Sequence, residues 1–93
     1  MIVGVCRVEL FIPGSLSLKD KRQVLQSLKD RLRDKFNLSV AEVEAQDLWQ
    51  KAVVGLACVA NEGQHVNQVL DQALNVIRGL PTVEVVQVRM ELL

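Results

Sequence analysis

Residues 2–36 read IVGVCRVELFIPGSLSLKDKRQVLQSLKDRLRDKF, and they carry the strongest structural signal in the chain. Residues 2–12 form a nearly continuous apolar run rich in β-branched side chains, which predicts a central β-strand. Pro13 and Gly14 end that strand. From Leu18 to Phe36 apolar residues recur at steps of three and four, as on one face of a helix. The stretch therefore predicts a buried strand followed by an amphipathic helix.

The rest of the chain continues this alternation of strands and helices. Ser17 stands three residues before Asp20, a spacing typical of a capping box at a helix start. Residues 38–45 alternate in polarity and predict a half-buried edge strand, whereas the apolar run of residues 52–60 predicts a central strand. Asn61 and Gln64 repeat the cap spacing before a second amphipathic helix, which Gly79 and Pro81 stop. Residues 83–92 predict a last strand whose apolar face is formed by Val86, Val88, Met90 and Leu92.

The order strand, helix, strand, strand, helix, strand is that of a ferredoxin-like α+β domain. Right-handed crossovers place both helices on one face of a four-stranded antiparallel sheet. A chain of 93 residues is short enough that we expect residues 1–93 to form a single domain. The predicted core includes Leu25, Leu28, Leu32, Val54, Leu56, Val66, Leu70 and Ile77.

The sheet face opposite the helices has no cover in this fold, and the residues expected there are unusually apolar for a surface in water. The side chains expected to contact a partner are Val3, Val5, Phe11, Val53, Val59 and Trp49. The simplest partner is a second copy of the chain, which predicts a homodimer. Trp49, in the turn of residues 46–50, has two interpretations: a lid over the edge of the core, which we favour, or a side chain offered to another chain.

The formal net charge is zero, but the charges are unevenly distributed. Residues 19–35 hold seven bases and three acids, so this segment carries +4 and the remainder of the chain −4. Three of the bases crowd the first turns of the helix, where the dipole favours acids. A phosphate or RNA backbone could bind there, and the residues expected to contact it are Ser15, Ser17, Lys19, Lys21, Arg22 and Lys29. The alternative is a solvated basic face with no ligand.

Any contact with RNA should involve the helix and the phosphate backbone. RNA-recognition sheets of this topology stack bases on aromatic side chains of the open face. The aromatic residues here are only Phe11, Phe36 and Trp49, and Phe36 belongs to the helix core. We therefore expect weak sequence specificity and strong salt dependence.

Catalytic and metal sites lack the residues that they need. The single histidine, His65, falls on the polar side of the second predicted helix, so no Ser-His-Asp or Cys-His set is available. Small acyl phosphatases share this size and topology but need an arginine after the first strand, and residues 12–18 contain none. Two cysteines and one histidine are too few for a structural zinc site. We expect no enzyme activity, cofactor or metal, and no small-molecule ligand.

The cysteines and the apolar runs also indicate a cellular setting. Cys6 and Cys58 lie inside apolar runs, where free thiols pack as small hydrophobic side chains. The apolar start of the chain meets Arg7 and Glu9 too early for a signal peptide, and no apolar run approaches the roughly 20 residues that span a bilayer. We expect a soluble cytoplasmic protein with no membrane partner.

Three strings carry a resemblance to a known family: SLKDKR at residues 17–22, NLSVAEVEAQDLWQKA at residues 37–52 and LACVAN at residues 56–61. With them, nearly the whole chain resembles the YlxP-like family of small bacterial proteins of unassigned function. The resemblance implies a ferredoxin-like fold, a bacterial cytoplasmic setting and genes often encoded near those of translation-initiation and ribosome-maturation factors. It implies no activity and no catalytic residue.

Two functional hypotheses follow from these observations. The leading one is a non-enzymatic binding module whose basic helix start contacts RNA, for example on the ribosome. The competing one is an interaction domain that uses the open sheet face, most simply as a homodimer, with no nucleic-acid role. Sensing of a nucleotide or another small anion ranks third.

Overall fold

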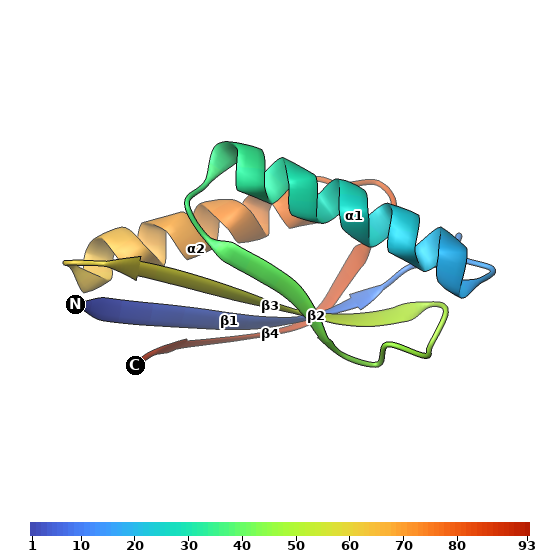
Figure 1. The fold of residues 1–93 in the computed structure, drawn as a ribbon, viewed down its shortest axis with the longest axis horizontal. Coiled ribbons are helices and arrows are strands. Elements are labelled where there is room, and N and C mark those ends of the chain that lie inside the picture. Colours follow the sequence, from blue (N-terminus) through green and yellow to red (C-terminus); the bar gives the residue numbers. More distant parts are fainter.

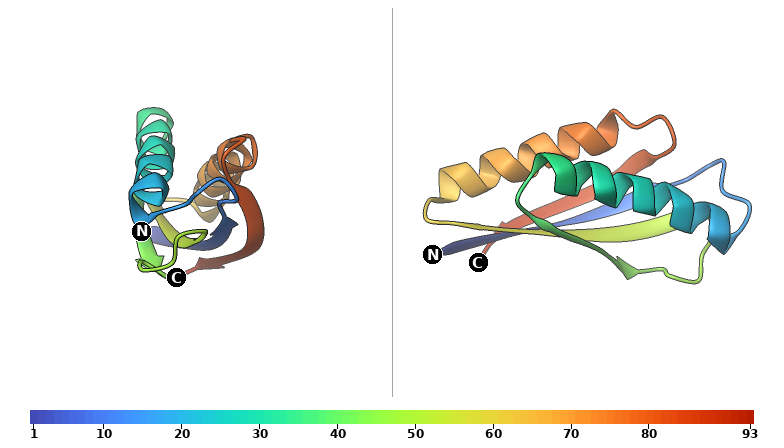
Figure 2. Two further views of the ribbon diagram at one scale, coloured as in Figure 1. Left: turned by 90° about the vertical axis from the view of Figure 1, so that its right-hand side faces the viewer. Right: turned by 45° about the horizontal axis from the view of Figure 1, so that its top comes forward.

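A computed structural model describes residues 1–93 and arranges them in two layers, helices above and sheet below (Figure 1). In chain order the elements are β1 (Ile2–Phe11), α1 (Leu18–Lys35), β2 (Ser39–Glu44), β3 (Lys51–Ala60), α2 (Gly63–Arg78) and β4 (Glu84–Leu92). The strands form one antiparallel sheet in the order β2-β3-β1-β4. Both helices cover the same face of this sheet, side by side (Figure 2). The predicted α+β ferredoxin-like fold is confirmed.

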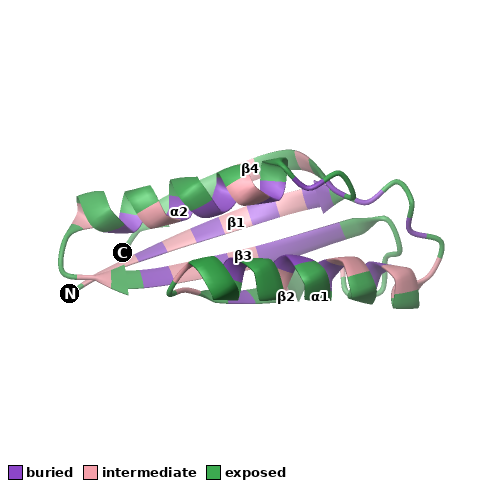
Figure 3. Ribbon diagram, turned by 90° about the horizontal axis from the view of Figure 1, so that it is seen from above, coloured by how far each residue is buried: buried purple, intermediate pink, exposed green.

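The core lies between the sheet and the two helices. Along β1 every second residue is buried, and these residues pair with buried positions of β3, such as Val8 with Val54 (Figure 3). All eight predicted core residues are buried, as the helical and strand periodicities require. Cys6 and Cys58 are buried free thiols, as predicted, and burial raises the pKa of the Cys6 thiol.

The two helices begin in different ways. Ser17 is the N-cap of α1: its Oγ accepts a hydrogen bond from the Asp20 amide at 3.0 Å, which confirms the predicted cap. The Asp20 carboxylate in turn accepts the Leu16 amide at 2.9 Å. In α2 the N-cap residue is Glu62, and no side chain caps the helix. The predicted Asn61 cap is wrong, because α2 begins one residue later than the spacing of Asn61 and Gln64 requires, with Glu62 at the N-cap.

Two irregularities change which side chains face the helices. The pairing of β1 with β4 shifts between Glu9 and Leu10, which leaves Val86 as an extra residue. Val85 takes the core side, and Val86 is 64% exposed. The prediction that Val86 shares a face with Val88 and Met90 is therefore wrong, because the extra residue reverses the alternation. In β2 a similar shift between Glu42 and Glu44 leaves Val43 as the extra residue.

Candidate functional site

The predicted anion site at the start of α1 is built partly from groups that already have partners within the chain. The Ser15 hydroxyl donates to the Ser17 carbonyl at 3.0 Å, and Ser15 is buried. Ser17 is half-buried, and its Oγ is engaged as the helix cap. The two serines therefore stabilise the connection between β1 and α1. The predicted ligand contact is wrong for Ser15, whose side chain solvent does not reach.

Lys21 departs further from the prediction, because its side chain is only 1% exposed. Its Nζ donates to the backbone carbonyls of Ala45, Gln46 and Lys51 at 2.8, 3.2 and 3.3 Å. The same Nζ lies 2.8 Å from Oε2 of Glu42, which is buried and has no hydrogen-bond partner besides this ion pair. Lys21 thus joins α1 to the β2–β3 hairpin. Its predicted role in binding an anion is wrong, since its charge is neutralised inside the protein.

The bases of α1 that do reach solvent include four on one side of the helix, which we call the basic stripe: Lys19, Arg22, Lys29 and Arg33. They follow one another at steps of three, seven and four residues, so they share a helical face. None of them forms an ion pair, because the three ion pairs of the structure use Arg7 and Lys21 as their bases. Arg33 also donates to the Val40 carbonyl at 3.1 Å, which places the stripe on the side of α1 next to β2.

The predicted interface residues of the strands all lie on the open face, but one of them is buried there. Phe11, Val59 and Trp49 are 38%, 54% and 56% exposed, and Val3 and Val5 are half-buried. Val53 is only 1% exposed, so its predicted contact with a partner is wrong. The physical reason is an ion-pair network that crosses β3 at the level of Val53.

Arg7 of β1 is the centre of this network. Its guanidinium reaches across β3 to Glu44 of β2 at 2.9 Å, and it also pairs with Glu9 at 3.0 Å. The hydrogen bonds and the charge of Arg7 hold the pKa of Glu44 below its ordinary value. Arg7 therefore joins β1 to β2 through Glu44 while it also pairs with Glu9 on its own strand. Arg89 and Glu91 form no ion pair.

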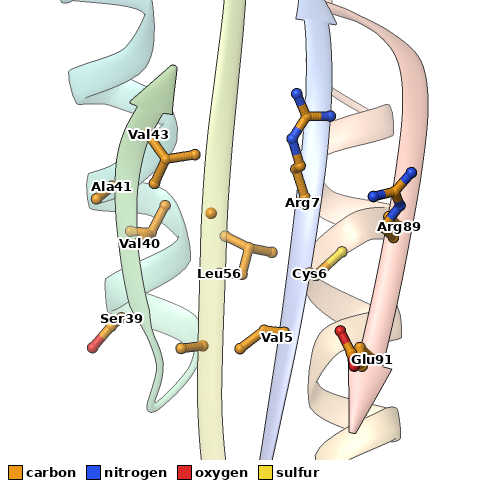
Figure 4. A pocket seen from close by; sticks show the side chains of 12 residues that line it. Val5, Cys6, Arg7, Ser39, Val40, Ala41, Val43, Leu56, Arg89 and Glu91 are labelled. Atoms are coloured by element: carbon orange, nitrogen blue, oxygen red, sulfur yellow. The ribbon is translucent and has the colours of Figure 1, made fainter. Parts of the chain in front are cut away.

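Beside the network the open face is hollowed into a groove of about 500 Å³. Gly55 and Ala57 of β3 form its floor, where Gly55 also leaves room for the Val43 side chain, and Val5 of β1 completes the apolar centre. Figure 4 shows the side chains that border the groove on its two sides, Ser39, Ala41 and Val43 from β2 and Arg7, Arg89 and Glu91 from β1 and β4. The groove is thus an apolar hollow with charges only along the β1 and β4 side.

The chain between β2 and β3, residues 45–50, which we call the Trp49 loop, corrects the favoured interpretation of Trp49. With 56% of its surface exposed, Trp49 is no lid over the core, and Leu48 beside it is 46% exposed. The loop itself is well anchored. Lys21 Nζ holds two of its carbonyls, and Gln50 Nε2 donates to the carbonyls of Pro13 and Ser15, each at 3.2 Å.

The structure also answers three other questions, about metal-binding groups, about the single histidine and about helices that could cross a membrane. No group of three or more histidine, cysteine, aspartate and glutamate side chains is placed to hold a metal ion. His65 is exposed on α2, as predicted. Neither helix is long and apolar enough to cross a membrane.

Comparison with known proteins matches residues 3–90 to a family model described as "Protein of unknown function (DUF503)". The chain belongs to this family. It is also 34% identical to the uncharacterized protein YlxP of Bacillus subtilis (strain 168) over 83 residues, which cover 89% of this chain and 90% of that protein. The YlxP-like resemblance is confirmed, and the family carries no assigned function.

Several residues of the site escaped the sequence analysis. Arg33 continues the spacing of Lys19, Arg22 and Lys29, so helical periodicity alone was sufficient to find it. Glu44 was not predictable as the partner of Arg7, because that contact depends on the strand order and on the shift at Val43. The burial of Lys21 also had a signal, because Lys21 precedes Leu25, Leu28 and Leu32 at helical steps on the core face of α1. Its partner Glu42 had no such signal, because that contact depends on how the helix packs on β2.

Proposed function

We propose that this protein is a non-enzymatic binding module that holds a phosphate backbone, most simply RNA, on the basic stripe of α1. The observation that carries the proposal is the alignment of Lys19, Arg22, Lys29 and Arg33 along one helical face with no ion pair among them. Bases without carboxylate partners release counterions when phosphates replace those ions, and this release drives binding.

The geometry of the stripe suits a backbone more than a single small anion. Arg33 lies fourteen helical steps after Lys19, so the stripe is about 21 Å long at the rise of an α-helix. Charges spread over that length match a row of phosphates along a strand. A compact phosphate pocket would instead need groups that converge, and the side chains at the helix start, Ser15, Ser17 and Lys21, are already engaged.

The three acids of α1, Asp20, Asp30 and Asp34, form no ion pair with the stripe. Asp20 holds the Leu16 amide, and Asp30 accepts a hydrogen bond from Gln26 at 2.8 Å. No aromatic residue belongs to the helix, so base stacking has no platform there. The stripe should therefore bind without reading sequence, because phosphate contacts position a ligand and do not specify it.

Removal of the stripe charges tests this function. We expect the triple variant Lys19→Gln, Arg22→Gln, Lys29→Gln to bind both structured and single-stranded RNA more weakly than the wild type, whatever the sequence. Each lost phosphate contact should also flatten the slope of log affinity against log salt concentration by about 0.7 to 0.9, so about 2 to 3 in total. Fluorescence anisotropy with labelled RNA at several salt concentrations measures both quantities.

A variant with the same change of charge elsewhere is the matched control. The control triple variant also removes three exposed bases, Arg31→Gln, Lys35→Gln and Arg78→Gln, and none of these bases belongs to the stripe. We expect this control to lose little affinity and to keep most of the salt slope. Equal losses in both triple variants would show that only net charge matters, and no measurable RNA binding by the wild type would reject the proposed function.

A further inference from the structure

The Trp49 loop combines a fixed backbone with an exposed apolar tip. Ala45, at its start, has a φ of 61°, a left-handed conformation that an L-alanine rarely adopts. The buried Lys21 ammonium holds the Ala45 carbonyl in place at 2.8 Å. A loop that is already ordered loses little entropy on binding, and tryptophan is among the residues that contribute most to interfaces. The loop therefore has the properties of a preformed contact element.

The groove on the open face has the complementary shape. Its volume of about 500 Å³ exceeds what one indole ring needs, and its centre is lined by Val5, Gly55 and Ala57. Figure 1 shows the Trp49 loop on the side of the sheet away from the helices, which is also the side of the groove. One molecule thus presents an apolar projection and an apolar hollow on the same face.

Trp49 and the groove floor at Ala57 lie at equal distances from Val53 along the line of β3. Pairing of this strand with β1 extends back to Gln50, whose carbonyl accepts the Ile12 amide at 2.8 Å. Trp49 is therefore the residue immediately before the paired region in the chain. Trp49 is four residues before Val53 and Ala57 is four residues after it, about 13 Å to each side at the rise of a strand. A two-fold axis between two sheets, at right angles to the strands and passing over Val53, exchanges these two positions.

We propose that the open face binds a second copy of this chain, in a two-fold homodimer in which the Trp49 loop of each subunit fills the groove of the other. The arrangement is isologous, so both grooves are filled at once. It also explains why the groove floor is formed by Gly55 and Ala57 while a neighbouring loop leaves an indole in solvent.

The charges of the face fit the same axis. The strand register places Arg89 in one row with Gly55, and Glu84 in one row with Lys51. Gly55 and Lys51 lie two residues to either side of Val53, so the axis sets Arg89 opposite Glu84 of the partner subunit. The charged side chains of the open face sum to only −1, so the net repulsion between two copies is small and the face does not attract nucleic acid: Arg7, Lys51, Arg89, Glu9, Glu44, Glu84 and Glu91.

The size of the face is close to what a stable pair needs. The molecule measures 42 × 21 × 17 Å, and the sheet extends along the longest and the shortest of these axes, because helices and sheet are stacked along the middle one (Figure 1). This footprint is on the order of 700 Å², against about 800 Å² per partner in a standard protein interface. The whole open face must therefore take part.

Trp49 is the single tryptophan of the chain, so its fluorescence reports directly on the loop. We expect sedimentation velocity to show a shift from monomer to dimer over roughly 1 to 500 µM. The emission maximum should move to shorter wavelength over the same concentrations, as the indole leaves water. A protein that stays monomeric over this range would overturn the proposal, and a dimer with unchanged emission would overturn the placement of the loop.

Substitutions on both sides of the contact test its geometry. Trp49→Ala should weaken the dimer about thirtyfold, as expected for a central indole. Ala57→Arg, which blocks the groove, should abolish the dimer, whereas Gln68→Arg on the exposed side of α2 adds the same charge and should have no effect. Circular dichroism establishes that each variant is folded. Dimers of wild-type strength in both Trp49→Ala and Ala57→Arg would reject the interface.

A charge exchange tests the position of the axis. Arg89→Glu and Glu84→Arg alone should each weaken the dimer about two- to fivefold, because each sets like charges opposite one another. The double variant restores opposite charges and should recover wild-type affinity. Additive losses in the double variant would reject the axis over Val53. None of these measurements involves RNA, so their outcome is independent of the basic stripe.

Discussion

Lys21 illustrates how one residue of a charged segment can be part of the interior. Its aliphatic chain crosses the edge of the core, and its ammonium neutralises Glu42 and holds three backbone carbonyls. A lysine is almost never fully buried unless it is paired in this way. The residue therefore links α1 to the hairpin that carries Val43, Glu44 and the Trp49 loop, so its role is to position the open face.

Lys21→Met should be strongly destabilising. Methionine fills a similar volume, but it leaves the carboxylate of Glu42, whose side chain is only 18% exposed, without a counter-charge. Breaking a buried pair in this way costs about 3 to 5 kcal/mol of the free energy of unfolding. Urea denaturation measures the loss, and Lys19→Met, two residues earlier on the exposed side, is the control with an expected change within about 0.5 kcal/mol. A loss below about 1 kcal/mol for Lys21→Met would contradict the described pairing.

At the scale of elements, the strands and helices were predictable, whereas the irregularities were not. The apolar runs of β1 and β3 and the leucine spacing of α1 are strong periodic patterns, so their core faces followed from the sequence. The extra residues Val43 and Val86 are valines, like Val40 and Val85, which are paired normally in the same strands. A shift in pairing depends on contacts between two strands, and the alternation of residues within one strand does not reveal those contacts.

The Trp49 loop shows the same limit. From the sequence, Trp49 was as compatible with a lid over the core as with a contact site. The residue pattern does not determine the direction in which a turn leaves the sheet. That direction depends on Ala45, whose positive φ is stabilised by contacts from α1 and not by its own residue type.

Ala45→Gly should therefore stabilise the protein. At a φ of 61° glycine avoids the clash of Cβ with the backbone, which costs an L-residue about 1 to 2 kcal/mol. The greater entropy of glycine in the unfolded chain offsets part of that gain, so we expect a net increase of about 0.5 to 1 kcal/mol in thermal or urea unfolding. Ala41→Gly in β2 is the matched control, and there we expect a decrease of similar size. A decrease at both positions would contradict the left-handed conformation of Ala45.

At the scale of the whole molecule, the two proposed surfaces are compatible. The basic stripe lies on the helix layer, and the groove lies on the opposite face of the sheet. A dimer closed by its open faces therefore leaves both helix layers outermost. Its axis sets the β2 edges of the two subunits one above the other, so both stripes lie along the same side of the dimer, separated by the two sheets. A short strand reaches only one stripe, whereas a long flexible strand can contact both.

This arrangement predicts a length-dependent effect of Trp49→Ala, which weakens the dimer and leaves the stripe intact. For an RNA of about 15 nucleotides, close to a single site, affinity per subunit should not change. For an RNA of about 60 nucleotides, linkage of two stripes raises the effective concentration at the second, and its loss should weaken binding at least about tenfold. Anisotropy measured at a protein concentration where only the wild type is dimeric gives both values. An equal loss with both lengths would instead place the indole on the RNA, and no loss with the longer RNA would show that the stripes act alone.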